Sequence, residues 1–219
     1  MVVKFSNDVD VLKYEPVLFG ELHLSSQVQA SGTGATMSGT TLTAAEADFV
    51  AAGIEAGGVV YLRSPEGSLD GAYEIVSVDS PTQLTVSVLR ADRRQPSVAP
   101  PAGSDVSYRI STLAPQAVDA AFQLTEHFGI QPGNPESSIS VDHLMDTEGL
   151  RRTSVLLVIS NVYATWANRT AGECFFRKSL LYQQLFEKAR QRCHLSVDLG
   201  SDGVADINRV GGVVRLVRD

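Results

Sequence analysis

The sequence predicts an α+β protein, in which a bundle of about three to four helices carries an inserted small β-barrel-like module and a C-terminal β-tail. Three observations predict this class. Residues 31–112 hold short β-rich runs between turn residues, residues 113–194 follow the helical period, and the last residues alternate as a strand does. We therefore expect four parts: an N-terminal segment, 1–30, that packs with the helical domain; the β-module, 31–112; the helical bundle, 113–194; and a C-terminal arm, 195–219.

The composition is that of a globular protein with a normal core. The chain has 219 residues, 43% of them hydrophobic, and a mean hydropathy near zero. Its apolar runs are shorter than the roughly 18 residues of a membrane helix, and its first residues have no signal-peptide core. We therefore expect a protein that is made and used in a cytoplasm, with no membrane partner.

The start of the chain indicates a short helix. Asn7 or Asp8 is suited to cap its first turn, and Pro16 lies where the helix should stop or bend. The sequence up to residue 30 then alternates weakly, which indicates an extended chain.

Residues 31–112 contain four clear runs of strand length, namely VVYLRS, AYEIVSVDS, QLTVSVLR and DVSYRIST, separated by turns rich in Pro, Gly, Asp and Ser. A barrel or rolled sheet of about five or six strands is the expected closure, because it removes exposed strand edges. The glycine-rich segment SGTGATMSG has neither a GxGxxG motif nor a P-loop lysine. It is expected to be a flexible or turn-forming linker, and SGTGATMSGTTLT as a whole a loop that leads into a strand.

Helical periodicity begins near residue 113 and predicts three main helices. The first, 113–128, is amphipathic; the second, 148–166, is apolar almost all round and should be the buried central helix; the third, 173–194, is long and amphipathic. The expected apolar stripe of the first helix is Val118, Ala121, Phe122 and Thr125. The residues expected to pack the helices together are Trp166, Leu181, Tyr182, Leu185 and Phe186.

The chain ends in a strand-like tail. From Val213 to Arg218, successive side chains fall on opposite faces, as they do along a strand. A strand at this place needs a partner edge, which another subunit or another protein would supply. The residues expected to make this contact are Arg209, Val213, Val214, Arg215, Leu216, Val217 and Arg218. The tail indicates assembly rather than catalysis.

The charge is unevenly distributed. Residues 1–147 carry 7 basic and 18 acidic side chains, whereas residues 148–219 carry 11 basic and 7 acidic ones, so the net charges are −11 and +4. An acidic first part argues against a broad nucleic-acid-binding surface. The basic part suits docking of an acidic partner, although charges on a long amphipathic helix often only solvate it.

No residue pattern supports an enzyme, a cofactor or a metal site. Cys174 and Cys193 flank one helix at a separation of roughly 28 Å, so two free, mostly buried thiols are expected. The segment DLGSDGVAD lacks the third and twelfth ligands of a calcium loop and is interpreted as an acidic turn. The histidines show neither HxxxH nor HExxH spacing, and no G-x-S-x-G elbow is present, although these patterns do not exclude a Ser-His-Asp triad.

The helical part resembles a known family. The runs RISTLAPQAVDAAFQLTEHFGI, EGLRRTSVLLVISNVYATWA and FFRKSLLYQQLFEKARQRCHLSVDLGSDGVAD are similar to head-to-tail adaptor, or connector, proteins of long-tailed bacteriophages and prophages. The shared features are the helix lengths, the aromatic segment with Tyr182 and Phe186, the aspartate- and glycine-rich turn after it, and the short tail. The similarity covers roughly residues 109–219, and the β-module looks like an insertion.

This resemblance implies a structural protein of the virion neck that is assembled in the host cytoplasm. It implies a homo-oligomeric ring, expected to be a dodecamer, that contacts the portal protein and the next neck protein (a stopper or tail terminator). DNA would pass through the ring without sequence-specific binding.

Two alternatives stay open. One is another neck or tail-end protein, such as a collar or tail-completion component, whose β-module binds fibres or another ligand. The other is a sugar- or protein-binding module, which would need exposed aromatic side chains in a groove of the barrel. Its candidates are Phe49, Tyr61, Tyr73 and Tyr108, but most strand aromatics belong to the core.

Overall fold

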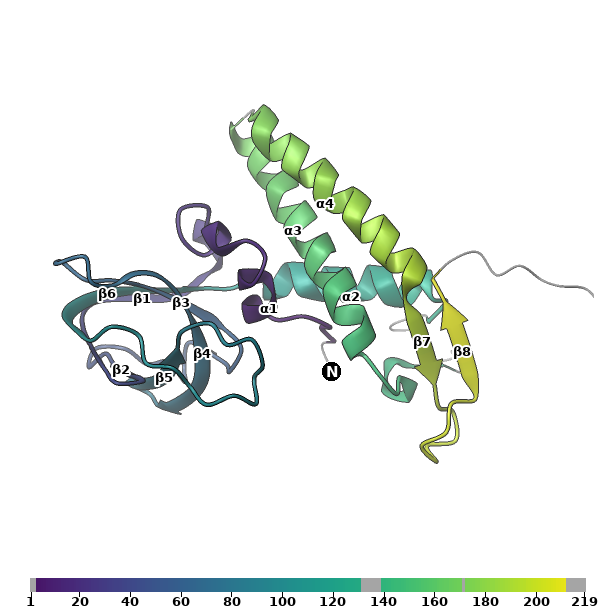
Figure 1. The fold of residues 1–219 in the computed structure, drawn as a ribbon, viewed down its shortest axis with the longest axis horizontal. Helices are drawn as coiled ribbons and strands as arrows, with labels where there is room; N and C mark the ends of the chain where they lie inside the picture. Colours follow the sequence, from purple (N-terminus) through teal and green to yellow (C-terminus); the bar gives the residue numbers. More distant parts are fainter. Residues whose placement is uncertain (1–2, 131–138, 171, 212–219) are drawn as a thin grey trace, which may run out of the picture. The chain divides into compact units, whose positions relative to one another are not determined.

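The computed structural model describes residues 3–130, 139–170 and 172–211 (Figure 1). These residues form a mixed α+β structure, which confirms the predicted class. They divide into two compact units. The barrel unit is Asn7–Leu113, and the helical unit combines the described residues before Asn7 with those from Ala114 onward.

The barrel unit begins with helix α1 (Asp8–Leu12), which Asn7 caps as expected. The Asn7 side chain accepts the Asp10 N–H, and the Asp10 carboxylate accepts the Asn7 N–H, each at 3.1 Å. The 3₁₀ turns η1 (Pro16–Leu18) and η2 (Ser25–Gln27) follow, so Pro16 starts a new turn beyond the end of the helix.

Residues 7–30 belong to the barrel unit, which differs from the expectation that residues 1–30 pack with the helical domain. The reason is a set of direct hydrogen bonds within the barrel unit. The Val9 N–H donates to the Gly57 carbonyl at 3.1 Å, and the Asp8 carboxylate accepts the Leu113 N–H at 2.8 Å.

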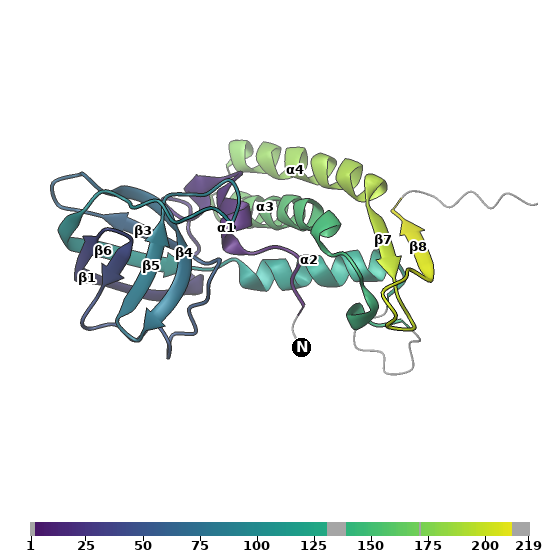
Figure 2. The same ribbon diagram turned by 60° about the horizontal axis from the view of Figure 1, so that its bottom comes forward.

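The barrel is a closed antiparallel sheet in the strand order β1-β2-β5-β4-β3-β6, and Figure 2 shows it turned by 60°. Closure occurs where β1 pairs with β6. It confirms the predicted small barrel and leaves no unpaired strand edge. The strands are β1 (Val28–Ser38), β2 (Thr41–Thr43), β3 (Val59–Arg63), β4 (Asp70–Ser80), β5 (Gln83–Ser87) and β6 (Gly103–Ser111).

Strand β1 corrects the expectation of a linker, because it contains most of the glycine- and threonine-rich segment. Ala35 and Met37 of this strand are buried in the barrel core. Gly32 is needed for packing: a Cβ there would lie 2.8 Å from the Tyr108 hydroxyl oxygen. Small residues therefore fill a tight part of the barrel wall, although their low strand propensity hides the strand in the sequence.

The barrel core combines aliphatic side chains with a pair of aromatic rings. Phe49 and Tyr108 meet edge to face, with ring centroids 5.7 Å apart. A buried ion pair lies near the end of the sheet, where Arg90 binds Glu74 at 2.7 Å. This hydrogen bond to the carboxylate raises the pKa of the Arg90 guanidinium.

The helical unit has three long helices and a short hairpin. Helix α3 packs against α2 on one side and α4 on the other, and Figure 2 shows α3 between the two. This placement agrees with the expected buried central helix, because the apolar residues around Leu156 and Tyr163 are almost fully covered. The elements are α2 (Ala114–His127), η3 (Val141–His143), α3 (Glu148–Thr170), α4 (Glu173–Arg192), β7 (His194–Val197) and β8 (Ile207–Val210).

Helix α2 buries only part of the expected stripe, namely Ala121 and Thr125. Phe122 is 50% exposed, and Val118 is only half-buried. The buried face is instead built from small residues, which let α2 approach the central helix closely. Its buried residues are Ala117, Ala120, Ala121, Leu124 and Thr125.

The C-terminal arm starts as a hairpin. Strands β7 and β8 are antiparallel, and His194 pairs with Val210. The predicted tail strand, Val213–Val217, lies outside the described residues. Among the helices that the structure describes, none combines the length and the apolarity that crossing a bilayer requires.

Candidate interaction surface

Helix α4 presents large apolar side chains to solvent. Only Ser179 and Phe186 of this helix are buried. Phe176, Leu180 and Leu181 are 55%, 46% and 52% exposed, and we call these three residues the outer face of α4. A surface helix normally turns its apolar stripe toward the core, so this face is a candidate contact surface.

The opposite side of α4 is well packed against α3. The Tyr163 ring stacks on the rings of Phe175 and Tyr182, with centroids 6.1 Å away in each case. The Ser160 hydroxyl donates to the Ser179 carbonyl at 3.0 Å, and the Lys178 ammonium donates to the Tyr163 hydroxyl at 2.9 Å. These contacts fix the orientation of α4, and with it the orientation of its outer face.

The expected packing residues divide between the two sides. Phe186 is buried, and Tyr182 and Trp166 are half-buried. The ring centroids of Trp166 and Phe175 are 6.2 Å apart. Leu185 is half-buried, whereas Leu181 is exposed. The helix geometry explains Leu181: it precedes Phe186 by five residues, which turns it about 140° away from the buried side.

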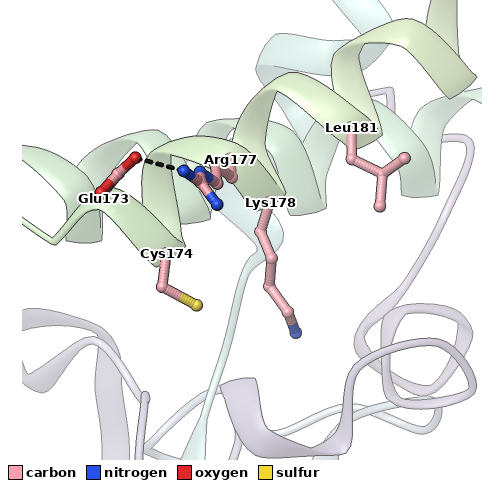
Figure 3. A pocket seen from close by; sticks show the side chains of 5 residues that line it. All are labelled: Glu173, Cys174, Arg177, Lys178 and Leu181. Carbon is pink, nitrogen blue, oxygen red and sulfur yellow. Dashed lines mark hydrogen bonds and ion pairs between the residues drawn. The ribbon is translucent and has the colours of Figure 1, made fainter.

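Figure 3 shows one flank of α4, where the side chains of Cys174, Lys178 and Leu181 line a shallow pocket. Glu173 and Arg177 also line this pocket and form an ion pair with each other. Cys174 is exposed, which corrects the expectation that it is mostly buried; its position at the first turn of α4 is solvent-facing. Cys193 is buried as expected, with its sulfur 3.0 Å from the Thr153 hydroxyl.

A second pocket lies between the start of α3 and the end of α4, and we call it the basic pocket. Arg152 of α3, Lys188 and Arg192 of α4, and His194 of β7 line it. Leu185 and Ala189 give it an apolar part. Arg152, Lys188 and Arg192 form no ion pair with any carboxylate in the described ranges.

Arg209 makes an intramolecular contact, since its guanidinium donates to the Phe128 carbonyl. Nearby, the Gly211 N–H donates to the Cys193 carbonyl at 2.9 Å. The β7–β8 hairpin is thereby attached to the end of α2 and to the end of α4. The other expected contact residues of the tail, Val213 to Arg218, lie outside the described residues.

The aspartate-rich loop between β7 and β8 uses its carboxylates on its own backbone. Asp198 accepts the N–H groups of Asp202 and Gly203, and Asp206 accepts those of Leu199 and Gly200. This geometry is that of a turn closed by side chains. Within the part of the chain that the structure describes, no group of three His, Cys, Asp or Glu side chains is placed to hold a metal ion.

The four candidate aromatic side chains of the barrel are buried or half-buried. Phe49 and Tyr108 are buried, while Tyr61 and Tyr73 are half-buried. The Tyr61 hydroxyl donates to the Asp70 carboxylate at 2.5 Å, and this bond, together with burial, raises the pKa of Tyr61. A shallow hollow beside Tyr61 is lined by Arg63 and by the hydroxyls of Ser31, Thr33 and Ser107.

Neither a family model, nor a curated protein, nor a solved structure matches this chain. The candidate site therefore stands on its own geometry. The sequence pattern did not indicate the outer face of α4 or the basic pocket. Only the spacing of Lys188 and Arg192, four residues apart, gave a signal that two cations share one helix face.

Proposed function

We propose that the chain is a structural subunit of an adaptor ring in the neck of a long-tailed bacteriophage or prophage particle. The observation that carries this proposal is the outer face of α4, where three large apolar side chains are exposed on a helix that is firmly packed on its other side. The likeness of residues 109–219 to head-to-tail adaptors supports the same conclusion.

The outer face of α4 suits a permanent contact with another copy. Burying a Phe or Leu side chain contributes about 1.5–3 kcal/mol. About half the surface of each of the three side chains is still exposed, so roughly half of this gain per residue remains available to a contact that covers them. In a head-to-tail contact, this face meets a different surface of the next copy, and a rotation that closes makes a ring.

The C-terminal arm is the proposed contact with the portal. The β7–β8 hairpin is anchored to the helical unit through Gly211 and Arg209, so the residues after 211 start from a fixed point. In this proposal, Val213–Val217 adds a strand to an edge of the portal or of an adjacent subunit. Arg215 and Arg218 would favour an acidic edge.

The chain's net charge of −7 is compatible with a DNA channel. A ring of acidic subunits repels phosphate, so DNA slides through it instead of binding. This part of the proposal requires acidic side chains on the inner surface of the ring, and an inner surface lined by arginine would contradict it.

Deleting residues 212–219 tests the portal contact directly, because it removes the tail but keeps the bond between Gly211 and Cys193. We expect the shortened chain to fold normally, as judged by its circular dichroism and melting temperature, but to lose co-sedimentation with purified portal rings. A matched variant, Arg215→Gln with Arg218→Gln, keeps the alternating pattern and should retain part of the binding. Unchanged co-sedimentation of the shortened chain would reject the tail as the portal contact.

The hollow on the barrel supports a second candidate function. Arg63 and three hydroxyl groups line it, which suits a ligand that offers hydrogen-bond acceptors. On this alternative, the chain is a collar or tail-completion component whose barrel holds a fibre. Loss of fibre attachment in an Arg63→Ser variant, with portal binding intact, would favour it over the adaptor.

A further inference from the structure

The basic pocket brings together three cationic side chains from two helices. Lys188 and Arg192 are four residues apart on α4 and therefore share a face, and Arg152 of α3 lines the same pocket. All three side chains are exposed, and none pairs with a described carboxylate. Like charges four residues apart on a helix are slightly destabilising, so an anion bound at Lys188 and Arg192 would relieve their repulsion.

Helix dipoles explain only part of this cluster. Arg192 is in the last turn of α4, where a cation is stabilised by the helix dipole. Arg152 lies near the start of α3, the end at which the dipole gives no reason for a cation. Arg190 and Arg151 show how the chain neutralises cations elsewhere, since they pair with Glu187 and Glu148.

The remaining charges around the pocket do not neutralise it. His194, at the start of β7, is a fourth nitrogen-bearing side chain in the lining. The acidic side chain there is Asp146, whose carboxylate already accepts the Glu148 N–H at 2.9 Å. The pocket thus offers more donors to an anion than its own residues use.

The lining also has an apolar part, made by Leu185 and Ala189 on the same face of α4 as Lys188 and Arg192. The phosphate groups of a nucleic-acid backbone would match the cations but not this apolar part. A peptide matches both, if it carries a leucine-like side chain between carboxylates. Guanidinium groups bind carboxylates through paired hydrogen bonds, which gives such a peptide both charge and direction.

We propose that the basic pocket binds an acidic peptide segment of a partner protein, with an apolar side chain resting on Leu185 and Ala189 and carboxylates bound by Arg152, Lys188 and Arg192. This inference concerns the helical unit alone and does not depend on the neck function. Binding in solution tests it, whatever particle the protein belongs to.

The test uses the full chain and a fluorescein-labelled peptide in which two leucines are flanked on each side by two glutamates. Fluorescence anisotropy at low salt should show saturable binding. The triple variant Arg152→Gln/Lys188→Gln/Arg192→Gln should bind at least about tenfold more weakly, since it removes all three cations. The matched control Arg177→Gln removes a cation of α4 that is already paired with Glu173, and its affinity should stay within about twofold of the wild type.

A second variant tests the apolar part of the pocket. Leu185→Ser should weaken the leucine peptide but leave a peptide with serines in place of the leucines unaffected. All variants are compared by melting temperature, so that a folding defect is recognised. Equal binding by the triple variant, or no saturable binding by the wild type, would overturn the proposal. Tighter binding of a short DNA duplex than of the peptide would also overturn it.

Discussion

In the barrel unit, every strand of the closed sheet is paired on both sides. In the helical unit, α4 packs firmly on the side that faces α3, but among the described residues its Phe176, Leu180 and Leu181 stay exposed. The barrel core is filled by side chains with almost no exposed surface. On α4, by contrast, about half the surface of Phe176, Leu180 and Leu181 is open to solvent. The core side chains of the barrel unit are therefore covered within the chain, whereas part of the apolar surface of α4 is not.

This difference indicates where the molecule needs other molecules. A closed barrel has no free edge to offer, so its contacts depend on side chains and loops. An incompletely covered helix gains free energy when another surface covers it. We therefore propose that the assembly contacts lie on the helical unit.

The largest expected effect is in the barrel. The side chains of Glu74 and Arg90 are 3% and 8% exposed, so Glu74→Ala leaves a buried guanidinium without its carboxylate, with only the carbonyls of Arg93 and Gln95 still accepting from it. We expect a loss of about 3–5 kcal/mol in the free energy of unfolding, measured by urea denaturation. The control is Glu173→Ala, which breaks an ion pair exposed on both sides and should cost less than about 1 kcal/mol. Similar losses in both variants would contradict the contrast between the units.

A smaller loss is expected from overpacking the barrel wall. Gly32→Ala places a Cβ 2.8 Å from the Tyr108 hydroxyl oxygen, inside normal contact distance. The ring must shift, and we expect a cost of about 1–3 kcal/mol by the same denaturation experiment. Gly71→Ala is the matched control, because the nearest atom to its added Cβ is 3.8 Å away. If Gly32→Ala is as stable as Gly71→Ala, β1 does not pack closely on Tyr108.

The barrel should also lose stability in alkali. The hydrogen bond to Asp70 and, to a smaller extent, burial raise the pKa of the Tyr61 hydroxyl above the ordinary value for tyrosine, about 10. The folded state then holds this proton more tightly than the unfolded state. The stabilisation is complete below about pH 10 and is lost as the pH rises through the folded pKa. Unfolding free energies measured from pH 8 to about 11.5 should fall less steeply for Tyr61→Phe than for the wild type.

The control for this pH series is Tyr14→Phe, at an exposed position. Its pH profile should follow that of the wild type. A Tyr61→Phe profile as steep as the wild type would show that the bond to Asp70 does not hold the proton.

The smallest effect on stability is expected on the outer face of α4. Phe176→Ser and Leu180→Ser change side chains that are 55% and 46% exposed, so the unfolding free energy of the monomer should change by no more than about 0.5 kcal/mol. If the proposed ring forms, assembly should nevertheless be lost: in sedimentation velocity the wild type should sediment as a ring and both variants as monomers. Gln184→Ser, an exposed polar position on the same helix, should assemble normally. Normal assembly of both serine variants would show that the outer face of α4 is not an assembly contact.

Much of the fold could be predicted because local patterns and tertiary structure agree. Asn7 carries its own capping signal, and the β-rich runs between residues 59 and 112 include four of the six strands of the barrel. The central helix was recognisable because α3 is apolar on nearly all sides. In these segments the chain specifies its structure over a few neighbouring residues.

The features that could not be predicted depend on contacts between residues that are distant in sequence. Strand β1 is held by its pairing with β6 and by the fit of Gly32 under Tyr108, and neither is visible in a glycine-rich segment. In α2, the small residues face α3 and Phe122 faces solvent, which reverses the choice that hydrophobicity alone favours. The basic pocket could not be predicted because Arg152 and Arg192 lie on different helices.

The most direct test of the central claim is a cryo-electron microscopy reconstruction of the particle neck, with this chain located by its barrel and its three long helices. The account predicts a ring directly beneath the portal, in which a neighbouring copy covers Phe176, Leu180 and Leu181 and the residues after Gly211 reach the portal. A ring in which these three side chains face solvent, or density for this chain at the tail tip or outside the neck, would contradict it.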